Sequence, residues 1–318
     1  MLAFVSKDAR CPRRRAAAVG TVERRPSRGW RSIGLALLLS MCSLDHGIAA
    51  EGSLGRFVRL RRDEDRAVSH LETAVVRYAR ETSREDPPLR VDLVGAIHIA
   101  DRDYYDLLNK RFATYDVVLY ELVAESDVRP QPGQRSAHPL SMMQVMMKNL
   151  LDLEFQLDGI DYAAQNFVHA DLSPDEFAES MSQRGESLAK MFFRLMGQGI
   201  AVQSKSPTES SDMRLAWAAL FSPNRSLDLK RAMAEQFEAT LAVPSVLDGP
   251  DGSTIITVRN GRAVEVLAEQ VSAGQRRIAI FYGAAHLPDM EAQLKERFEL
   301  LPQETEWLPA WSMAPPAR

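Results

Sequence analysis

Beyond residue 50, the spacing of apolar residues alternates between the two-residue period of strands and the longer period of helices. The pattern predicts strands over residues 56–60 and 70–79, with a polar turn between them. A buried strand over residues 91–94 is followed by an amphipathic helix, and residues 116–123 form the next strand. These last three elements make one β-α-β unit, whose crossover favours parallel neighbouring strands.

The rest of the chain repeats this arrangement once. Residues 129–139 hold three prolines and a glycine, which mark a loop, and a mostly helical insertion follows over about residues 139–245. A strand over residues 277–282 then leads into another amphipathic helix. We therefore expect one α/β domain over residues 51–311, with a central sheet built from two related strand-motif-helix units, the helical insertion between them, and a tail at residues 312–318.

The two units share a Gly-x-x-His motif. Each buried strand ends at a glycine, Gly95 or Gly283, and a histidine, His98 or His286, follows three residues later and just before a helix. Glycine suits a strand end where the backbone turns sharply or approaches another group closely. Because parallel strands end at one edge of a sheet, the two histidines could share a ligand or a metal there.

A carboxylate is expected at the same edge. Glu121 comes near the end of a strand that is apolar on both sides of it, where an unpaired charge is costly. It therefore needs a partner, which could be a metal, an arginine or a protonated histidine. In the alternative interpretation Glu121 lies on an edge strand and faces solvent.

The first fifty residues are typical of an export signal. Arginines over residues 24–31 precede a short apolar run at residues 33–42, and the segment closes on Ala49-Ala50. The run is shorter than the roughly 20 apolar residues of a transmembrane helix, so a cleaved signal is favoured over an N-terminal anchor. The protein is thus expected to be periplasmic or secreted. Membrane contact would arise only through an uncleaved leader.

Charge excludes one class of partner. The leader carries nine Lys or Arg and three acids, which leaves 30 basic and 40 acidic residues and a net charge of −10 for the remainder. A nucleic-acid partner is not expected, because phosphate binding depends on a basic surface. Both cysteines, Cys11 and Cys42, lie inside the leader, so a mature chain would contain no thiol.

Several motifs, in this order, resemble the TraB/PrgY/GumN family, which includes the Tiki-type metalloproteases. The resemblance covers roughly residues 70–300, and its hallmark is two Gly-x-x-His motifs plus a glutamate. The matching residues are Gly95-x-x-His98 with Tyr104-Tyr105, Tyr115-Asp116 with Glu121-Leu122, Gly159 to Tyr162, Asn166 to Asp171, Arg259-Asn260, and the run from Tyr282 to Pro288. The resemblance implies a divalent-metal-dependent peptidase or a peptide-inactivating protein.

The candidate residues support such chemistry. His98, His286 and Glu121 could hold a Zn, Mn or Co ion with an open position, as in catalytic metal sites. Glu121 could instead be the general base. Arg259 is a candidate for stabilising an oxyanion or orienting Glu121, and alternatively a plain surface or ion-pair residue; Asn260 shares these alternatives.

Two positions depart from the family pattern. Val258 stands where the family often has Glu, and Asp289 where it often has Gly. If the missing Glu transfers protons in relatives, catalysis is in doubt here, and a non-catalytic exported protein that sequesters a peptide, metal or haem is the rival function. Of the other histidines, His169 is the only further site candidate, and a satisfied structural histidine is the favoured interpretation. The sequence predicts neither the substrate nor the oligomeric state.

Overall fold

A computed structural model describes residues 54–80, 87–130, 150–186, 222–241 and 253–314. The leader expected at residues 1–50 lies outside the described residues, as do parts of the helical insertion. Among the helices of the described residues, none is long and apolar enough to cross a membrane.

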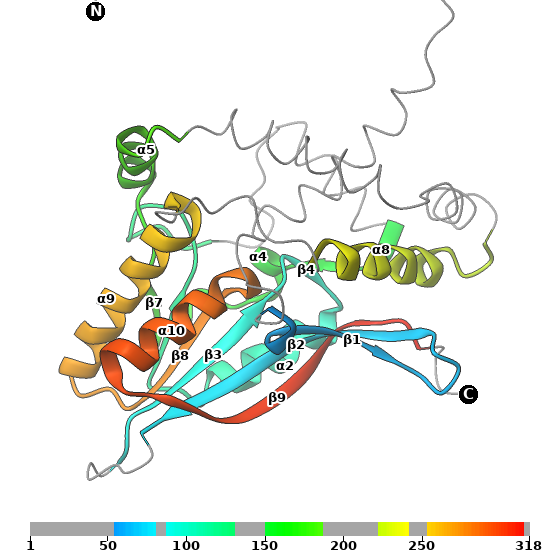
Figure 1. The fold of residues 1–318 in the computed structure, drawn as a ribbon, viewed down its shortest axis with the longest axis horizontal. Helices are drawn as coiled ribbons and strands as arrows, with labels where there is room; N and C mark the ends of the chain where they lie inside the picture. Colours follow the sequence, from blue (N-terminus) through cyan, green and yellow to red (C-terminus); the bar gives the residue numbers. More distant parts are fainter. Residues whose placement is uncertain (1–53, 81–86, 131–149, 187–221, 242–252, 315–318) are drawn as a thin grey trace, which may run out of the picture.

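The centre of the protein is a mixed sheet, so the α/β fold class predicted from the sequence is confirmed (Figure 1). Its strand order is β1-β2-β3-β8-β5-β7, and β9 pairs with the free side of β2. Strands β3, β8, β5 and β7 run parallel, whereas β1, β2, β3 and β9 pair antiparallel. The strands are β1 (Val58–Arg62), β2 (Val68–Ala79), β3 (Arg90–Ala96), β5 (Val117–Tyr120), β7 (Phe167–His169), β8 (Arg277–Gly283) and β9 (Leu301–Ser312).

Helices cover both faces of this sheet. Alternate residues of the central strands pack into two separate apolar clusters, one with helix α2 and the other with helices α9 and α10. Figure 1 shows α9 and α10 crossing one face while α2 lies behind the sheet. The helices are α2 (Arg102–Phe112), α4 (Gln156–Gly159), α5 (Pro174–Gln183), α8 (Arg225–Leu241), α9 (Arg259–Ser272) and α10 (Leu287–Phe298).

Short elements connect these layers. A two-stranded sheet joins β4 (Ile99–Ala100) to β6 (Glu154–Phe155), and so links the first histidine loop to the insertion. Three helical turns complete the described elements: η1 (Leu54–Arg56), η2 (Thr254–Val258) and η3 (Ala284–His286). The last of these is the second Gly-x-x-His motif itself.

The structure differs from the sequence-based expectation in three places. The strands of the predicted β-α-β unit, β3 and β5, are not neighbours, because β8 lies between them and pairs in parallel with both. The insertion between the two units is not only helical, because β7 joins the main sheet beside β5. At the C-terminus, β9 continues to Ser312 along β2, and Met313 beyond it is buried with its N–H donated to the Ser69 carbonyl (2.8 Å). The expected tail at 312–318 therefore begins inside the fold.

Candidate functional site

The two Gly-x-x-His motifs begin at the ends of β3 and β8, which are neighbouring parallel strands, so they share one edge of the sheet as the sequence predicts. Ala96 of β3 pairs with Gly283 of β8, so both strands end at the same edge of the sheet. On the other side of β8, β5 ends at Tyr120, which pairs with Phe281. Glu121 is the next residue, and its backbone N–H is donated to the Phe281 carbonyl (3.2 Å). The topology therefore brings the candidate carboxylate to the same edge as the two motifs.

Glu121 is largely buried and held by two hydrogen bonds. Its Oε1 accepts from Arg259 Nη2 (2.7 Å), and its Oε2 accepts from the backbone N–H of Gly283 (2.6 Å). The side chain is 9% exposed, and β5 lies between β8 and β7, so the alternative of a solvent-facing glutamate on an edge strand is wrong. Of the three partners expected for Glu121, the structure shows arginine directly.

The pKa of Glu121 reflects opposing influences. Burial by itself raises the pKa, but the charge of Arg259, then the imidazoles of His286 and His98, and the Gly283 N–H together lower it from 4.5 to about 2. Glu121 is therefore ionised at neutral pH. Both motif histidines act on the same carboxylate, although 188 residues separate them.

Asn260 fixes the orientation of the His286 ring. Asn260 Nδ2 donates to the His286 carbonyl (3.0 Å) and to Asp289 Oδ2 (2.7 Å), so its Oδ1 is the atom that accepts from His286 Nδ1 (2.7 Å). The proton of a neutral His286 therefore lies on Nδ1. The Nε2 lone pair then faces Glu121 Oε1 at 3.6 Å. Asp289, one of the departures from the family pattern, supplies an acceptor in this network.

Arg259 lies in the first turn of α9 and is 7% exposed, so it is not a plain surface residue, whereas the alternative of an ion-pair residue agrees with its contacts to Glu121 and Asp171. Besides its bond to Glu121, it makes a bidentate ion pair with Asp171, from Nε to Oδ1 (2.9 Å) and from Nη2 to Oδ2 (2.6 Å). The role expected for Arg259 in orienting Glu121 agrees with these contacts. Asp171 had no assigned role in the sequence analysis.

His98 lies on the turn between β3 and β4 and is exposed. The backbone around it is fixed, because the Ile97 carbonyl accepts from Tyr105 Oη (2.8 Å) and the His98 carbonyl accepts from the Gln156 N–H (2.8 Å). Within the described ranges, no three His, Cys, Asp or Glu side chains are grouped as a metal site. The contacts thus bring Glu121 and His286 together, and His98 is linked to them as one of the charges that lower the Glu121 pKa.

The motif glycines have different surroundings. A Cβ at Gly95 would lie 3.4 Å from the Ala74 carbonyl oxygen and 3.6 Å from the Cβ of Ala284, so little space is left beside it. Gly283 contributes its N–H to Glu121 instead. Each glycine therefore touches the site or the strand next to it.

His169 has a structural contact. Its Nε2 lies 2.6 Å from the Leu122 carbonyl oxygen and donates to it, and the ring packs edge-on against Tyr120. This contact holds the loop that follows Glu121, which agrees with the favoured interpretation of a satisfied histidine.

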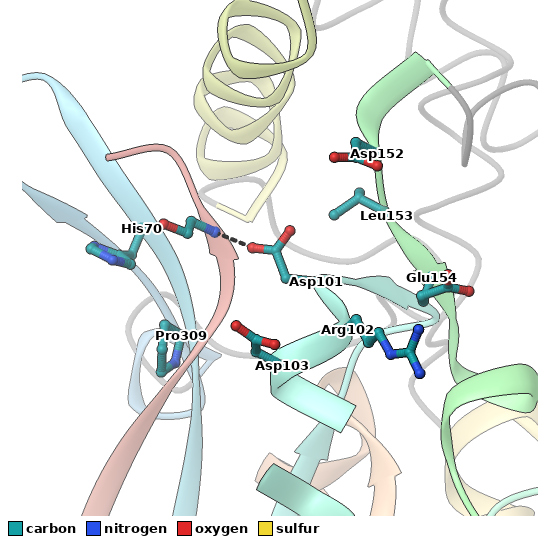
Figure 2. Close-up of a pocket in the computed structure, with 9 residues that line it drawn as sticks. His70, Asp101, Arg102, Asp103, Asp152, Leu153, Glu154 and Pro309 are labelled. Carbon is teal, nitrogen blue, oxygen red and sulfur yellow. Dashed lines mark hydrogen bonds between the residues drawn. The ribbon is translucent and has the colours of Figure 1, made fainter. Parts of the chain in front are cut away.

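A hollow of about 670 Å³ lies elsewhere on the described surface, at the start of α2 and the end of β9 (Figure 2). Asp101 at its wall is already engaged, with Oδ1 accepting from Lys230 Nζ (2.5 Å) and Oδ2 from the Ser312 N–H (2.5 Å). The hollow includes none of the motif residues. Its lining consists of His70, Asp101, Arg102, Asp103, Asp152, Leu153, Glu154, Pro309 and Ser312.

Comparisons of the chain with protein-family models, curated proteins and solved structures gave no match. The resemblance to the TraB/PrgY/GumN family accordingly rests on the motifs of the sequence. The site that those motifs form is described by its own geometry, and the geometry is the basis for the proposal that follows.

Proposed function

We propose that this chain is a divalent-metal-dependent hydrolase of peptides or proteins, with His286, Glu121 and His98 as the metal ligands. The observation that carries the proposal is the pair formed by His286 and Glu121. When the ring is neutral, Nε2 carries its lone pair and faces an ionised carboxylate oxygen 3.6 Å away. Two electron-pair donors that face each other in a buried place are stabilised by a cation.

The spacing of this pair fits a metal. Zinc ligands lie about 2.0–2.2 Å from the ion, which puts two ligands of one tetrahedral ion roughly 3.4 Å apart. The 3.6 Å between Nε2 and Oε1 is close to that separation and exceeds ordinary hydrogen-bond length. One imidazole nitrogen, one carboxylate oxygen and a second histidine nearby make a donor set suited to Zn, Mn or Co.

The charge of the buried residues also favours a cation. Glu121 and Asp171 share the single positive charge of Arg259, so the three side chains together carry a formal net charge of −1. Their side chains are between 0% and 9% exposed, and water screens this charge poorly. A bound cation would offset the negative charge.

The residues around such a metal site would have different roles. A divalent ion would supply a bound water of lowered pKa and would polarise a substrate carbonyl. Arg259 and the Gly283 N–H orient Glu121, and Asn260 keeps His286 in one tautomer. His98 is exposed and so is the member of the set that a substrate can approach from solvent.

The peptidase activity and its place outside the cytoplasm rest on the sequence. The ordered Gly-x-x-His motifs support the peptidase class through the family resemblance, and the Arg-rich leader supports export. The net charge of −10 beyond the leader argues against a nucleic-acid substrate.

Val258 favours a second candidate function. It stands in place of a glutamate of the family, it is half-buried beside Arg259, and its side chain cannot transfer protons. A non-catalytic exported protein that sequesters a peptide, metal or haem would keep the metal pair without needing that group. Metal content alone does not separate the two functions, because both retain the ligands.

Cleavage of a peptide library separates them. The purified full chain is incubated with the library, with chelator, and with chelator followed by excess Zn, Mn or Co. We expect cleavage that stops with chelator and returns with one of the metals, and that is lost in His286→Ala but kept in His70→Ala, a histidine outside the site. Metal binding without cleavage would support the sequestering protein instead. The absence of both metal binding and cleavage would overturn the proposal.

A further inference from the structure

We infer that Asp171 is a positioning residue that limits Arg259 to a single hydrogen bond with Glu121 and so keeps that carboxylate in place as a metal ligand; this inference rests on the proposed function. Asp171 follows β7 and lies at the edge where Glu121 follows β5. The two strands are neighbours, and the Ala170 N–H is donated to the Tyr120 carbonyl (3.2 Å). The sheet itself therefore brings a second carboxylate to Arg259.

Asp171 is held rigidly from both sides. Its side chain is fully buried, and its Oδ1 also accepts from the N–H of Leu172 (2.8 Å). The carbonyl of Ala170 accepts from Tyr282 Oη on β8 (2.5 Å). A group anchored in this way sets the position of its partner, because the partner's long side chain is the more flexible member of the pair.

The hydrogen bonds show how Arg259 is divided between the two carboxylates. Asp171 takes Nε and one hydrogen of Nη2, which leaves the second Nη2 hydrogen for Glu121. Glu121 consequently receives a single hydrogen bond from the guanidinium. Without Asp171, Arg259 could turn and pair with Glu121 through two parallel bonds, the geometry that arginine and carboxylates favour.

That rearrangement would change the site. Loss of the Asp171 charge would raise the formal net charge of the three positions from −1 to zero, and a bidentate pair would place the whole guanidinium against Glu121. Its second bond would go to Glu121 Oε2, which now accepts from the Gly283 N–H, and would pull the carboxylate out of its present position beside His286. We therefore expect Asp171 to maintain the metal affinity of the site without touching a metal or a substrate.

The test compares Asp171→Asn with Asp92→Asn in the full chain. Asp92 is a matched control, because it is 3% exposed, accepts from Tyr115 Oη (2.7 Å) and lies 3.4 Å from Arg77, yet it is near the start of β3 and not at the strand end that carries the motif. Two quantities are measured: Co²⁺ affinity by titration, and the Arg259 Nε–H signal in metal-free protein by ¹⁵N NMR, assigned through Arg259→Lys.

We expect Asp171→Asn to weaken Co²⁺ binding at least about tenfold, as loss of the hydrogen bonds that orient a metal ligand does in other metal sites. The Arg259 signal should also shift. Asp92→Asn should lower the melting temperature to a similar extent and leave both quantities unchanged. Unchanged Co²⁺ affinity in Asp171→Asn, or an equal loss in both variants, would overturn the inference.

The outcome for the wild-type chain keeps the two proposals apart. If it binds no Co²⁺ but its Arg259 signal still responds to Asp171→Asn, the proposed function fails and the positioning of Arg259 by Asp171 is upheld. If that signal does not respond, the positioning role is contradicted whatever the metal result.

Discussion

At Glu121, burial and the neighbouring charges and hydrogen bonds shift the pKa of the carboxyl group in opposite directions. Burial alone would favour the neutral acid, whereas Arg259, the two histidines and the Gly283 N–H favour the carboxylate and hold its pKa at about 2. The sequence predicted that this residue needs a partner, since its neighbours are apolar. It could not predict which partner, because Arg259 and Asp171 lie 138 and 88 residues from the atoms they contact.

The lowered pKa of Glu121 predicts a dependence of stability on pH. Because the folded-state pKa lies below 4.5, the ionised carboxylate stabilises the fold above pH 4.5, and this contribution is lost as pH falls toward 2. Its size corresponds to roughly 3 kcal/mol. Urea unfolding of the wild type and Glu121→Gln, both in chelator, should show a difference in unfolding free energy that shrinks from pH 4.5 to pH 2. A constant difference across that range would contradict the assignment.

Asn260 gives a second prediction at this scale. Asn260→Ala removes the acceptor for His286 Nδ1, so the proton can move to Nε2 and block the lone pair that faces Glu121. We expect Zn²⁺ affinity to fall about tenfold to a hundredfold. The ¹⁵N shifts of the His286 ring in metal-free protein report the tautomer directly. A ring that keeps its proton on Nδ1 in the variant would show that Asn260 does not set it.

At the scale of elements, the period of the apolar residues predicted the strands and helices of both motif units. It missed β9, whose sequence contains Pro302 and Pro309 and whose side chains are mostly exposed over its first half. Proline is tolerated there because β9 pairs only with β2 and leaves its other side unpaired among the described strands. An edge strand with one partner leaves little of the alternation that identifies a strand in the sequence.

The strand end at Gly95 provides a prediction for one element. The space beside it admits a methyl group in ordinary contact but not two further carbons. Gly95→Ala should therefore preserve metal affinity. Gly95→Val should displace the end of β3, so that metal binding is weakened while the melting temperature falls only slightly. Calorimetric titration and thermal unfolding of both variants provide the comparison. Equal metal affinity in Gly95→Val would count against a site that depends on this strand end.

At the scale of the whole molecule, parallel strands from distant parts of the chain end at one edge, and this placement assembles the site. The two Gly-x-x-His motifs occupy β3 and β8, Glu121 follows β5 and Asp171 follows β7. The sequence predicted the first three positions from strands followed by polar residues. Asp171 also follows a strand, but β7 has only three residues and gives too short a pattern to place it in the sheet.

The leader gives a prediction for the entire chain. The Arg-rich segment, the short apolar run and the small residues that follow predict removal near Ala49 or Ala50 on export. Intact-mass measurement of the exported protein should give a chain that begins close to residue 50 or 51. A mass that retains residues 24–45 would contradict cleavage and support an N-terminal anchor.

The most direct test of the central claim is a double-mutant cycle on metal affinity with His98→Ala, His286→Ala and the combined variant. If both histidines and Glu121 surround one ion, either single change should abolish most binding, and the combined change should cost little more, because groups that act as a unit are strongly non-additive. Unfolding curves of all three variants confirm that the fold is retained. Losses that simply add, as those of distant independent sites do, would contradict a shared metal site.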